Sequence, residues 1–252
     1  MIFIANFKMM LTTPMAVKLI KENLPSYKGF AEEHDIVICP PATALRELLA
    51  ILNNTTLHLG AQTCSCATAG AFTGEISPSD LAACGATYCI IGHSERRSLY
   101  HESNDQIAIK ASLLVSHDIT PIVCIGESKS DHHGGLTQKT IESQLSPVLH
   151  AIAGTDLQKA LLIAYEPIWS IGTGQIPQPE ELSTIFSSLA SFIERKSPNT
   201  PYKLLYGGSV SSKTISTLAQ VKPLHGFLIG GASLDFQEFK KIVDYFHCPA
   251  PN

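Results

Sequence analysis

Eight short apolar runs alternate with longer segments along this chain of 252 residues, and few folds accommodate such a pattern. Several of the runs are apolar throughout instead of alternating with polar residues, which is typical of strands buried on both faces. We therefore predict strands at residues 3–7, 36–39, 57–60, 88–91, 121–125, 161–166, 203–206 and 226–229.

Helix-start signals occur in the longer segments. Thr13-Pro14 and Ser77-Pro78 each place a capping residue before a proline at the first helical position. Ser103 and Gln106 fit the capping-box pattern, in which two side chains satisfy each other's backbone N–H groups. Helices are expected to open near residues 13, 77, 103, 179, 212 and 234.

The alternation of strands and helices predicts an α/β fold. No linker rich in Gly, Ser or Pro interrupts it, so we expect a single domain spanning residues 1–252. Eight parallel strands with right-handed crossovers close most naturally into a (β/α)8 barrel surrounded by helices. An open doubly wound sheet is the alternative, but it usually carries a glycine-rich fingerprint after its first strand, and Ala5-Asn6-Phe7-Lys8 is not one.

Composition excludes several classes of partner. Hydrophobic residues make up 44 % of the chain, which suits a globular protein with a sizeable core. The formal net charge is −4 and no long run of Lys or Arg occurs, so we expect no nucleic-acid partner. The N-terminal MIFIANFKMM lacks the features of a signal peptide, and no apolar run approaches the roughly 18 residues of a membrane span. We expect a cytoplasmic protein with no membrane partner.

Seven cysteines occur, an odd number, and none forms a CxxC pair. This usage is typical of reduced, packed cysteines in the cytosol. We expect no metal. A zinc site built from Cys64, Cys66 and a distant histidine is one alternative, and ligation by the adjacent His132 and His133 is another.

Polar residues and paired glycines follow several of the predicted strands. In a (β/α)8 barrel the chemistry takes place where the strands end and the following loops begin. Barrel closure would therefore bring together residues that are far apart in the sequence, namely Asn6, Lys8, His93, Glu95, Glu166, Ser209, Gly230 and Gly231.

Seven motifs follow one another in the order found in one known family. They are Asn6-Phe7-Lys8-Met9, Gly70-Ala71-Phe72-Thr73-Gly74-Glu75, Ile91-Gly92-His93-Ser94-Glu95-Arg96-Arg97, Ala164-Tyr165-Glu166-Pro167-Ile168-Trp169, Ile171-Gly172-Thr173-Gly174, Tyr206-Gly207-Gly208-Ser209-Val210 and Gly230-Gly231-Ala232-Ser233-Leu234. On these motifs the chain resembles the triosephosphate isomerase family along essentially its whole length. The resemblance implies a TIM barrel that interconverts D-glyceraldehyde 3-phosphate and dihydroxyacetone phosphate, in glycolysis and gluconeogenesis, without a cofactor.

The resemblance assigns catalytic roles. It implies that Glu166 is the base that moves a proton between adjacent carbons through an enediolate, and that His93 is the electrophile that polarises the substrate carbonyl. A glutamate becomes a stronger base toward a C–H bond when water is excluded from it. We expect Ser94 to open a helical turn whose dipole keeps the imidazole of His93 neutral. Lys8 matches the family's fixed positive charge, and Glu95 matches the residue that positions that lysine.

The phosphate site can be inferred from backbone chemistry. Gly230 and Gly231 would let bare N–H groups approach an anion at the start of a helix. Ser209 would add a donor, and Gly172 would add its N–H when its loop closes. By resemblance, residues 167–174 form a lid, Tyr206 and Ser209 latch it, Asn6 binds substrate, and Cys124 packs near the base.

The chain departs from the family pattern in three places. Phe7 and Met10 replace the usual Trp and Asn. Gln175-Ile176-Pro177 replaces the usual second hinge, and because proline removes an N–H we expect a changed rate of lid closure. In the family, the loop Thr63–Gly74 reaches a neighbouring subunit, so the resemblance implies a homodimer. Here its tip reads TCSCATA, and we expect an exposed Cys64 or Cys66 to be open to oxidation.

Two other functions compete with an isomerase. One is a phosphate-binding barrel enzyme with another substrate that uses the same paired glycines and Ser209. The other is a binding or sensor module that has kept the fold and lost turnover. The combination of Lys8, His93 and Glu166 favours the isomerase, because it suits enolisation of a very small substrate and because a module without turnover would be expected to lose Glu166 or His93 first.

Overall fold

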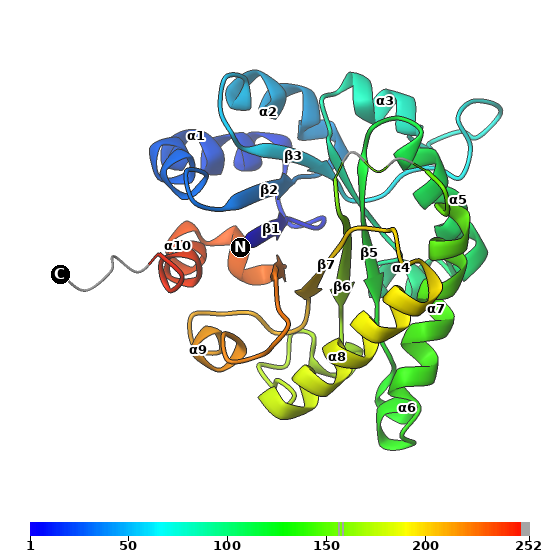
Figure 1. Ribbon diagram of the computed structural model, residues 1–252. Coiled ribbons are helices and arrows are strands. Elements are labelled where there is room, and N and C mark those ends of the chain that lie inside the picture. The colour runs from blue at the N-terminus through cyan, green and yellow to red at the C-terminus, as the bar shows by residue number, and fades with distance from the viewer. Residues whose placement is uncertain (156, 158, 248–252) are drawn as a thin grey trace.

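A computed structural model describes residues 1–155, 157 and 159–247. Its eight strands are parallel and pair in chain order, and the last pairs with the first, so the sheet closes into a barrel (Figure 1). The prediction of a (β/α)8 barrel is confirmed. The strands are β1 (Ile2–Asn6), β2 (Asp35–Cys39), β3 (His58–Ala61), β4 (Tyr88–Ile91), β5 (Thr120–Ile125), β6 (Leu161–Tyr165), β7 (Tyr202–Tyr206) and β8 (Gly226–Ile229).

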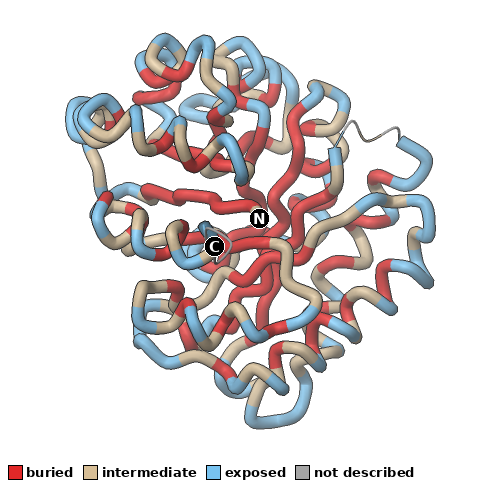
Figure 2. The backbone as a smooth tube through the Cα atoms, turned by 60° about the vertical axis from the view of Figure 1, so that its left-hand side comes forward, coloured by how far each residue is buried: buried red, intermediate tan, exposed pale blue. Residues whose placement is uncertain are grey.

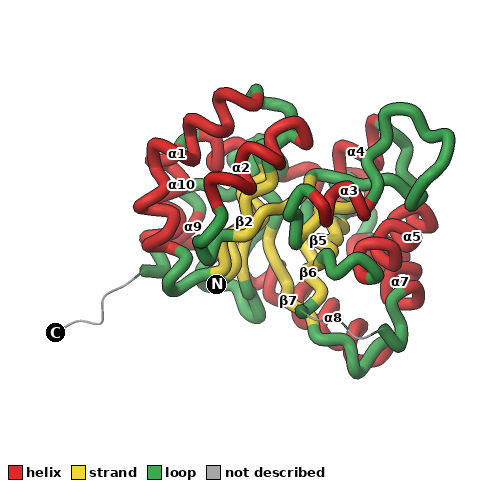
Figure 3. Tube along the Cα trace, turned by 90° about the horizontal axis from the view of Figure 1, so that it is seen from above, coloured by secondary structure: helices red, strands yellow, loops and turns green. Residues whose placement is uncertain are grey.

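Helices surround the barrel (Figure 3). They are α1 (Thr13–Phe30), α2 (Leu45–Leu52), α3 (Pro78–Ala83), α4 (Ser94–Leu99), α5 (Asn104–Val115), α6 (Lys129–His133), α7 (Thr137–Ala151), α8 (Pro179–Lys196), α9 (Ile215–Leu218) and α10 (Phe236–Asp244). Three short 3-10 helices are η1 (Ala42–Ala44), η2 (Ile168–Ser170) and η3 (Gly231–Leu234). None of the helices in the described part of the chain is both long and apolar enough to cross a membrane.

Alternate residues of each strand face two separate cores. Within β1, Ile2 and Ile4 belong to the cluster inside the barrel, whereas Phe3 and Ala5 belong to the larger cluster between the barrel and the helices. Side chains of a strand point alternately to its two faces, so both faces of this sheet are covered. The strands are accordingly the most deeply buried part of the chain (Figure 2), which explains why they read as unbroken apolar runs.

Two helix starts agree with their sequence signals. Ser77 caps α3 by accepting a hydrogen bond from the backbone of Asp80, and Ser103 and Gln106 form a capping box at α5. The last two helices begin later than predicted. Thr214, not Ser212, occupies the N-cap position of α9. Asp235, not Leu234, caps α10, because residues 231–234 first form η3.

The loop after β3 extends away from the barrel, as the cyan segment at the right of Figure 1. The expectation that Cys64 is exposed is wrong, since only 2 % of its surface is accessible and it belongs to the outer core. Cys66 is half-buried, and burial raises the pKa of its thiol. Both cysteines are therefore poorer targets for oxidation than the composition of the loop suggested.

Candidate active site

Every second side chain of a strand points into the barrel, and this alternation continues into the residues of the site. Leu162 and Ala164 point into the barrel, so the next inward position along β6 is Glu166. Likewise Ile2 and Ile4 are followed by Asn6. A two-residue period therefore places both polar side chains on the axis of the barrel, just beyond its apolar filling.

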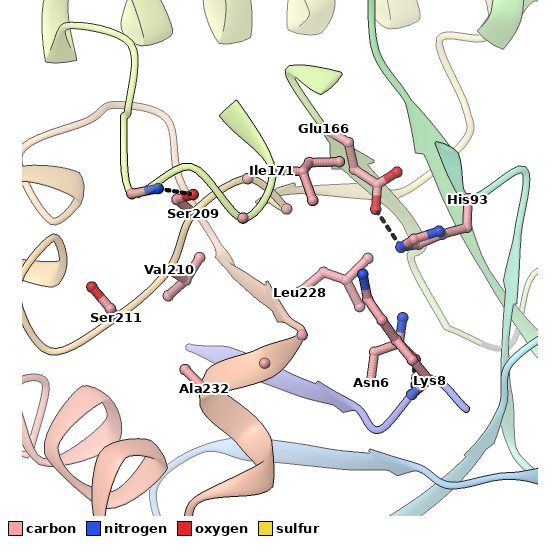
Figure 4. A pocket seen from close by; sticks show the side chains of 16 residues that line it. Asn6, Lys8, His93, Glu166, Ile171, Ser209, Val210, Ser211, Leu228 and Ala232 are labelled. Atoms are coloured by element: carbon pink, nitrogen blue, oxygen red, sulfur yellow. Dashed lines mark hydrogen bonds and ion pairs between the residues drawn. The ribbon is translucent and has the colours of Figure 1, made fainter. Parts of the chain in front are cut away.

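A cavity of about 290 Å³ lies at this end of the barrel. Its size suits a small ligand, since pockets for drug-sized molecules begin at about 300 Å³. Figure 4 shows the side chains around it. The cavity is lined by Asn6, Lys8, His93, Glu166, Ile171, Gly172, Gly174, Gly207, Gly208, Ser209, Val210, Ser211, Leu228, Gly230, Gly231 and Ala232.

Glu166 is buried and only half of its carboxylate is hydrogen-bonded. The side chain is 2 % exposed, and Oε2 accepts a hydrogen bond of 3.0 Å from the backbone N–H of Ser94. Oε1 lies 3.2 Å from Nε2 of His93, but their mutual geometry does not make a hydrogen bond, and Oε1 has no other partner among the described residues. One oxygen of a buried carboxylate is thus left unpaired beside the cavity.

The hydrogen bonds of His93 define which ring nitrogen carries its proton. Nδ1 accepts a hydrogen bond of 3.2 Å from the backbone N–H of Glu95, and the Glu95 carboxylate is farther away, at 3.6 Å. A nitrogen that accepts has no proton of its own, so in the neutral ring the proton is assigned to Nε2. Nε2 faces Glu166 (Figure 4). His93 can therefore present a hydrogen-bond donor to a molecule in the cavity.

Lys8 has an unusual backbone and two anchored polar ends. Its φ is +50°, a left-handed conformation that is uncommon for residues other than glycine. Its N–H donates to Oδ1 of Asn6 at 3.0 Å, and its carbonyl accepts from Nε2 of Gln62 at 2.8 Å. Its ammonium lies 2.6 Å from Oε1 of Glu95. The lysine is thus positioned at the cavity, and it is the only Lys or Arg among the lining residues.

Two glycines follow β8 at the cavity, next to Lys8. Gly230 and Gly231 lie at the start of η3 and line the cavity. A Cβ atom at Gly230 would lie 3.2 Å from Cε of Lys8, so a larger residue would press on the lysine stem. The stem of Lys8 therefore packs against Gly230, whereas a Cβ atom at Gly231 would have nothing within 4 Å, so open space remains beside Gly231.

The segment after β6, residues 167–177, is called the lid below. It is in contact with the loop after β7. The N–H of Gly174 donates to Oγ of Ser209 at 3.2 Å, and Ser209 Oγ donates to the carbonyl of Ser170 at 2.5 Å. The Tyr206 hydroxyl lies 3.1 Å from Oγ of Ser170. The hydroxyl of Ser209 is thus engaged by the lid and not directed at the cavity, while Gly172 of the lid lines the cavity.

Sequence reasoning missed three residues that support the site. Arg97 donates to the carbonyl of Gly92 at 2.7 Å and to that of Cys124 at 3.1 Å. Glu127 is fully buried and accepts hydrogen bonds of 3.0 Å from Tyr165 and Trp169. Gln62 is the third, through its bond to Lys8. A carboxylate close to the end of an apolar strand was a signal for Glu127, which follows β5 and Gly126, as it was for Glu166, but nothing in the sequence marked Gln62.

Cys124 is completely buried next to Glu166. Burial, followed by the charge of Glu166, raises the pKa of its thiol well above the usual value. A thiol of this kind stays protonated and unreactive at neutral pH. It therefore fills the barrel interior beneath Glu166, together with the other residues of the inner core.

Metal-ligating side chains gather at a different end of the described structure. Glu33, His34 and His247 have ligand atoms within 4.8 Å of one another. His34 directly precedes β2, so the group lies at the amino ends of the strands, opposite the cavity. Within residues 1–155, 157 and 159–247, neither Cys64 and Cys66 nor His132 and His133 form such a group. Cys248 lies outside the described residues.

Fold and site together define a (β/α)8 barrel with a carboxylate and an imidazole side by side at the carboxyl ends of its strands. The model of the triosephosphate isomerase family matches residues 1–246. The triosephosphate isomerase of Caldanaerobacter subterraneus subsp. tengcongensis is 38 % identical over 97 % of this chain and 98 % of its own. Those of Thermoanaerobacter pseudethanolicus and Clostridium botulinum (strain ATCC 19397 / Type A) are 37 % and 36 % identical over the same shares. The chain belongs to the triosephosphate isomerase family.

Proposed function

We propose that this chain interconverts D-glyceraldehyde 3-phosphate and dihydroxyacetone phosphate, with Glu166 as base and His93 as electrophile. Oε1 of Glu166 takes the proton from the carbon next to the carbonyl, while Nε2–H of His93 donates to the carbonyl oxygen. The electrons of the C–H bond move toward that oxygen and form an enediolate. Return of the proton to the adjacent carbon, with a proton shift between the two oxygens, completes the isomerisation.

The unpaired oxygen of Glu166 is the observation that supports this reaction best. A buried oxygen without a hydrogen bond costs about 1–3 kcal/mol, and of the three described carboxylates that carry one, Glu102, Glu127 and Glu166, only Glu166 lines the cavity. A module that only bound phosphate would gain nothing from such a cost. A base that must receive a proton from carbon needs a free lone pair that faces its substrate.

Lys8 and Asn6 supply charge and orientation in this proposal. The ammonium of Lys8 is held by Glu95 and reaches the cavity, so it can attract the anionic substrate and stabilise charge on its oxygens. Asn6 is also buried at the cavity, where its side chain fixes the backbone of Lys8. Ser94 holds the second oxygen of Glu166 through its backbone N–H.

The phosphate of the substrate would be bound mainly by backbone N–H groups. We assign it to the backbone N–H groups of Gly230, Gly231, Ser209 and, from the lid, Gly172, all of which line the cavity. Backbone N–H groups at the start of a helical turn bind anions without a side-chain charge. This arrangement fits a protein whose formal net charge is −4.

A homodimer formed through the loop Thr63–Gly74 is part of the proposal. Phe72 in this loop is 53 % exposed, and Met9, next to Lys8 in the sequence, is 95 % exposed. Removing exposed apolar side chains from water by packing them against another protein is favourable. Leu99 and Tyr100, at the end of α4, are exposed as well. A second copy of the chain would cover these side chains.

We further propose that the chain works as one domain in the cytoplasm, in glycolysis and gluconeogenesis, and without a metal or cofactor. The membership of the family supports the pathway. Enolisation by a carboxylate and an imidazole requires neither a metal nor a redox group.

Turnover in D₂O tests the proton-transfer chemistry. If Glu166 removes a proton from carbon, the enzyme-bound proton can exchange, and part of the dihydroxyacetone phosphate formed should carry deuterium at the carbon that was the aldehyde. The variant His93→Gln should convert roughly 10²- to 10³-fold more slowly, because it loses the imidazole donor. Conversion without any deuterium in the product would contradict the mechanism.

A further inference from the structure

Ser170 is the residue on which the hydrogen bonds of the lid converge. It ends η2, directly before Ile171 and Gly172, which line the cavity. Its side chain is fully buried, with 0 % exposure. Its Oγ donates to the carbonyl of Gln175 at 2.6 Å and lies 3.1 Å from the hydroxyl of Tyr206. From the sequence, Ser170 was expected only to be part of the lid.

The direction of these bonds follows from the proton count. A serine hydroxyl has one hydrogen, and a carbonyl can only accept. The hydrogen of Ser170 therefore goes to Gln175, and Tyr206 must donate its own hydrogen to Ser170. Burial raises the pKa of Tyr206 to about 12, so its phenol keeps that hydrogen at neutral pH. A chain of donors runs from β7 through Ser170 to the far arm of the lid.

The carbonyl of Ser170 adds a second set of bonds. It accepts from Oγ of Ser209 at 2.5 Å and from Oγ1 of Thr173 at 2.9 Å. Ser209 in turn accepts from the N–H of Gly174. The side chain and the carbonyl of Ser170 thus connect both arms of the lid to the loop after β7.

Pro177 and Gly208 determine how Ser170 makes this connection. Pro177 has no N–H, so the second arm of the lid cannot donate a backbone hydrogen bond there. This arm is held through an acceptor, the carbonyl of Gln175, which receives the hydrogen bond of the Ser170 hydroxyl. A Cβ atom at Gly208 would lie 2.3 Å from the Tyr206 hydroxyl and 3.0 Å from Oγ of Ser170. Gly208 therefore leaves the space in which the two hydroxyls meet.

We propose that Ser170 is a positioning residue that holds the lid closed over the cavity, so that Gly172 stays against the anionic group of the substrate. The inference rests on the proposed isomerase function for its substrate. Ser170 does not touch the reacting carbons in this scheme. It acts through the lid, and its loss should weaken the retention of the substrate more than the proton transfer.

The variant Ser170→Ala removes both hydroxyl bonds and leaves Glu166 and His93 unchanged. Each net hydrogen bond contributes a factor of roughly 2 to 13 at 25 °C. We expect the KM for glyceraldehyde 3-phosphate to rise about tenfold and kcat to stay within about threefold. Tyr206→Phe removes one bond and should raise KM about fourfold. The double variant should resemble Ser170→Ala, because both changes act on the same chain of bonds.

The test compares these three variants with Ser187→Ala, a change of the same kind at an exposed position of α8. Besides kcat and KM, the fluorescence of Trp169, the only tryptophan of the chain and part of the lid, is titrated with inorganic phosphate. The control should behave as the wild type does. Ser170→Ala should need about tenfold more phosphate for half of the fluorescence change.

Three results would overturn the inference. They are a KM and a phosphate response within twofold of the wild type, a fall in kcat with KM unchanged, or a double variant whose effect is the product of the two single effects. A wild-type protein that responds to phosphate but does not turn over the triose would refute the proposed function alone. In that case the phosphate titration of Ser170→Ala still decides the role of Ser170.

Discussion

The substitution Gly207→Ala should disable the proposed base without removing any functional group. Gly207 is the inward position that follows Leu205 on β7, and its N–H bonds to the carbonyl of Tyr165 at 2.8 Å. A Cβ atom there would lie 2.9 Å from Cγ of Glu166. Carbon atoms in contact are normally about 3.5–4.0 Å apart, so the side chain of Glu166 would have to move by about 1 Å.

That movement sets the expected size of the effect. A misplacement of about 1 Å in a catalytic group can cost roughly 10²-fold in rate. We therefore expect kcat for glyceraldehyde 3-phosphate to fall about 100-fold. The free energy of unfolding should fall by about 1–3 kcal/mol, as for other crowded interior positions.

The same change at Gly29 is the control. Gly29 lies in α1, and a Cβ atom there would have nothing within 4 Å. Gly29→Ala should leave kcat unchanged and should stabilise the protein by roughly 0.5–1 kcal/mol, since alanine favours helix. Steady-state kinetics and urea unfolding measure both variants. If Gly207→Ala keeps kcat within threefold of the wild type, the position of Glu166 is not what limits the chemistry, and the reasoning fails.

Three further predictions concern charge and assembly. Lys110 and Arg96 bind the buried Glu102. Burial acts to raise the pKa of Glu102, but these two bonds hold that pKa below its usual value. Glu102→Gln should therefore lower the free energy of unfolding by about 3–5 kcal/mol at pH 7. A lowered pKa stabilises the fold above the pKa of the unfolded state, so the wild type should lose this advantage as the pH falls below about 4.3. If urea unfolding shows the same difference in free energy between the two proteins at every pH, this prediction is wrong. Lys8→Met should reduce kcat/KM roughly 100-fold or more, measured at several salt concentrations, and an unchanged kcat/KM would exclude the lysine from the site. Phe72→Asp should shift the protein toward monomer in sedimentation velocity, because it buries a charge in the proposed interface, and an unchanged sedimentation coefficient in both proteins would place the interface elsewhere.

The strands could be predicted well because burial on both faces leaves a local trace. Every predicted strand end lies within one residue of the observed end. The helix starts at Ser77 and Ser103 were equally local, since the capping side chains bond within their own turn. At α10 the sequence could not show that η3 would come first, because the glycines that open it also permit other turns.

The residues at the site were predicted by position, and the resemblance also predicted the contact between Glu95 and Lys8, but other supporting contacts were missed. Glu166 and Asn6 follow apolar strands, so their place was readable from the period of the chain. Gln62 binds Lys8 across 54 positions of sequence, and Ser170 meets Tyr206 across 36. Such contacts depend on how the closed barrel brings loops together, and no local pattern encodes them. The burial of Cys64 was missed for the same reason.

The most direct test is the conversion of glyceraldehyde 3-phosphate by the purified protein and by Glu166→Gln, with no added metal or cofactor. The change keeps the size of the side chain and a carbonyl oxygen, but it removes the carboxylate that accepts the proton. We expect fast conversion by the wild type and a loss of at least about 10³-fold in kcat for the variant, with both proteins folded by circular dichroism. A folded wild type that leaves the substrate unchanged, or a Glu166→Gln variant as fast as the wild type, would contradict the central claim.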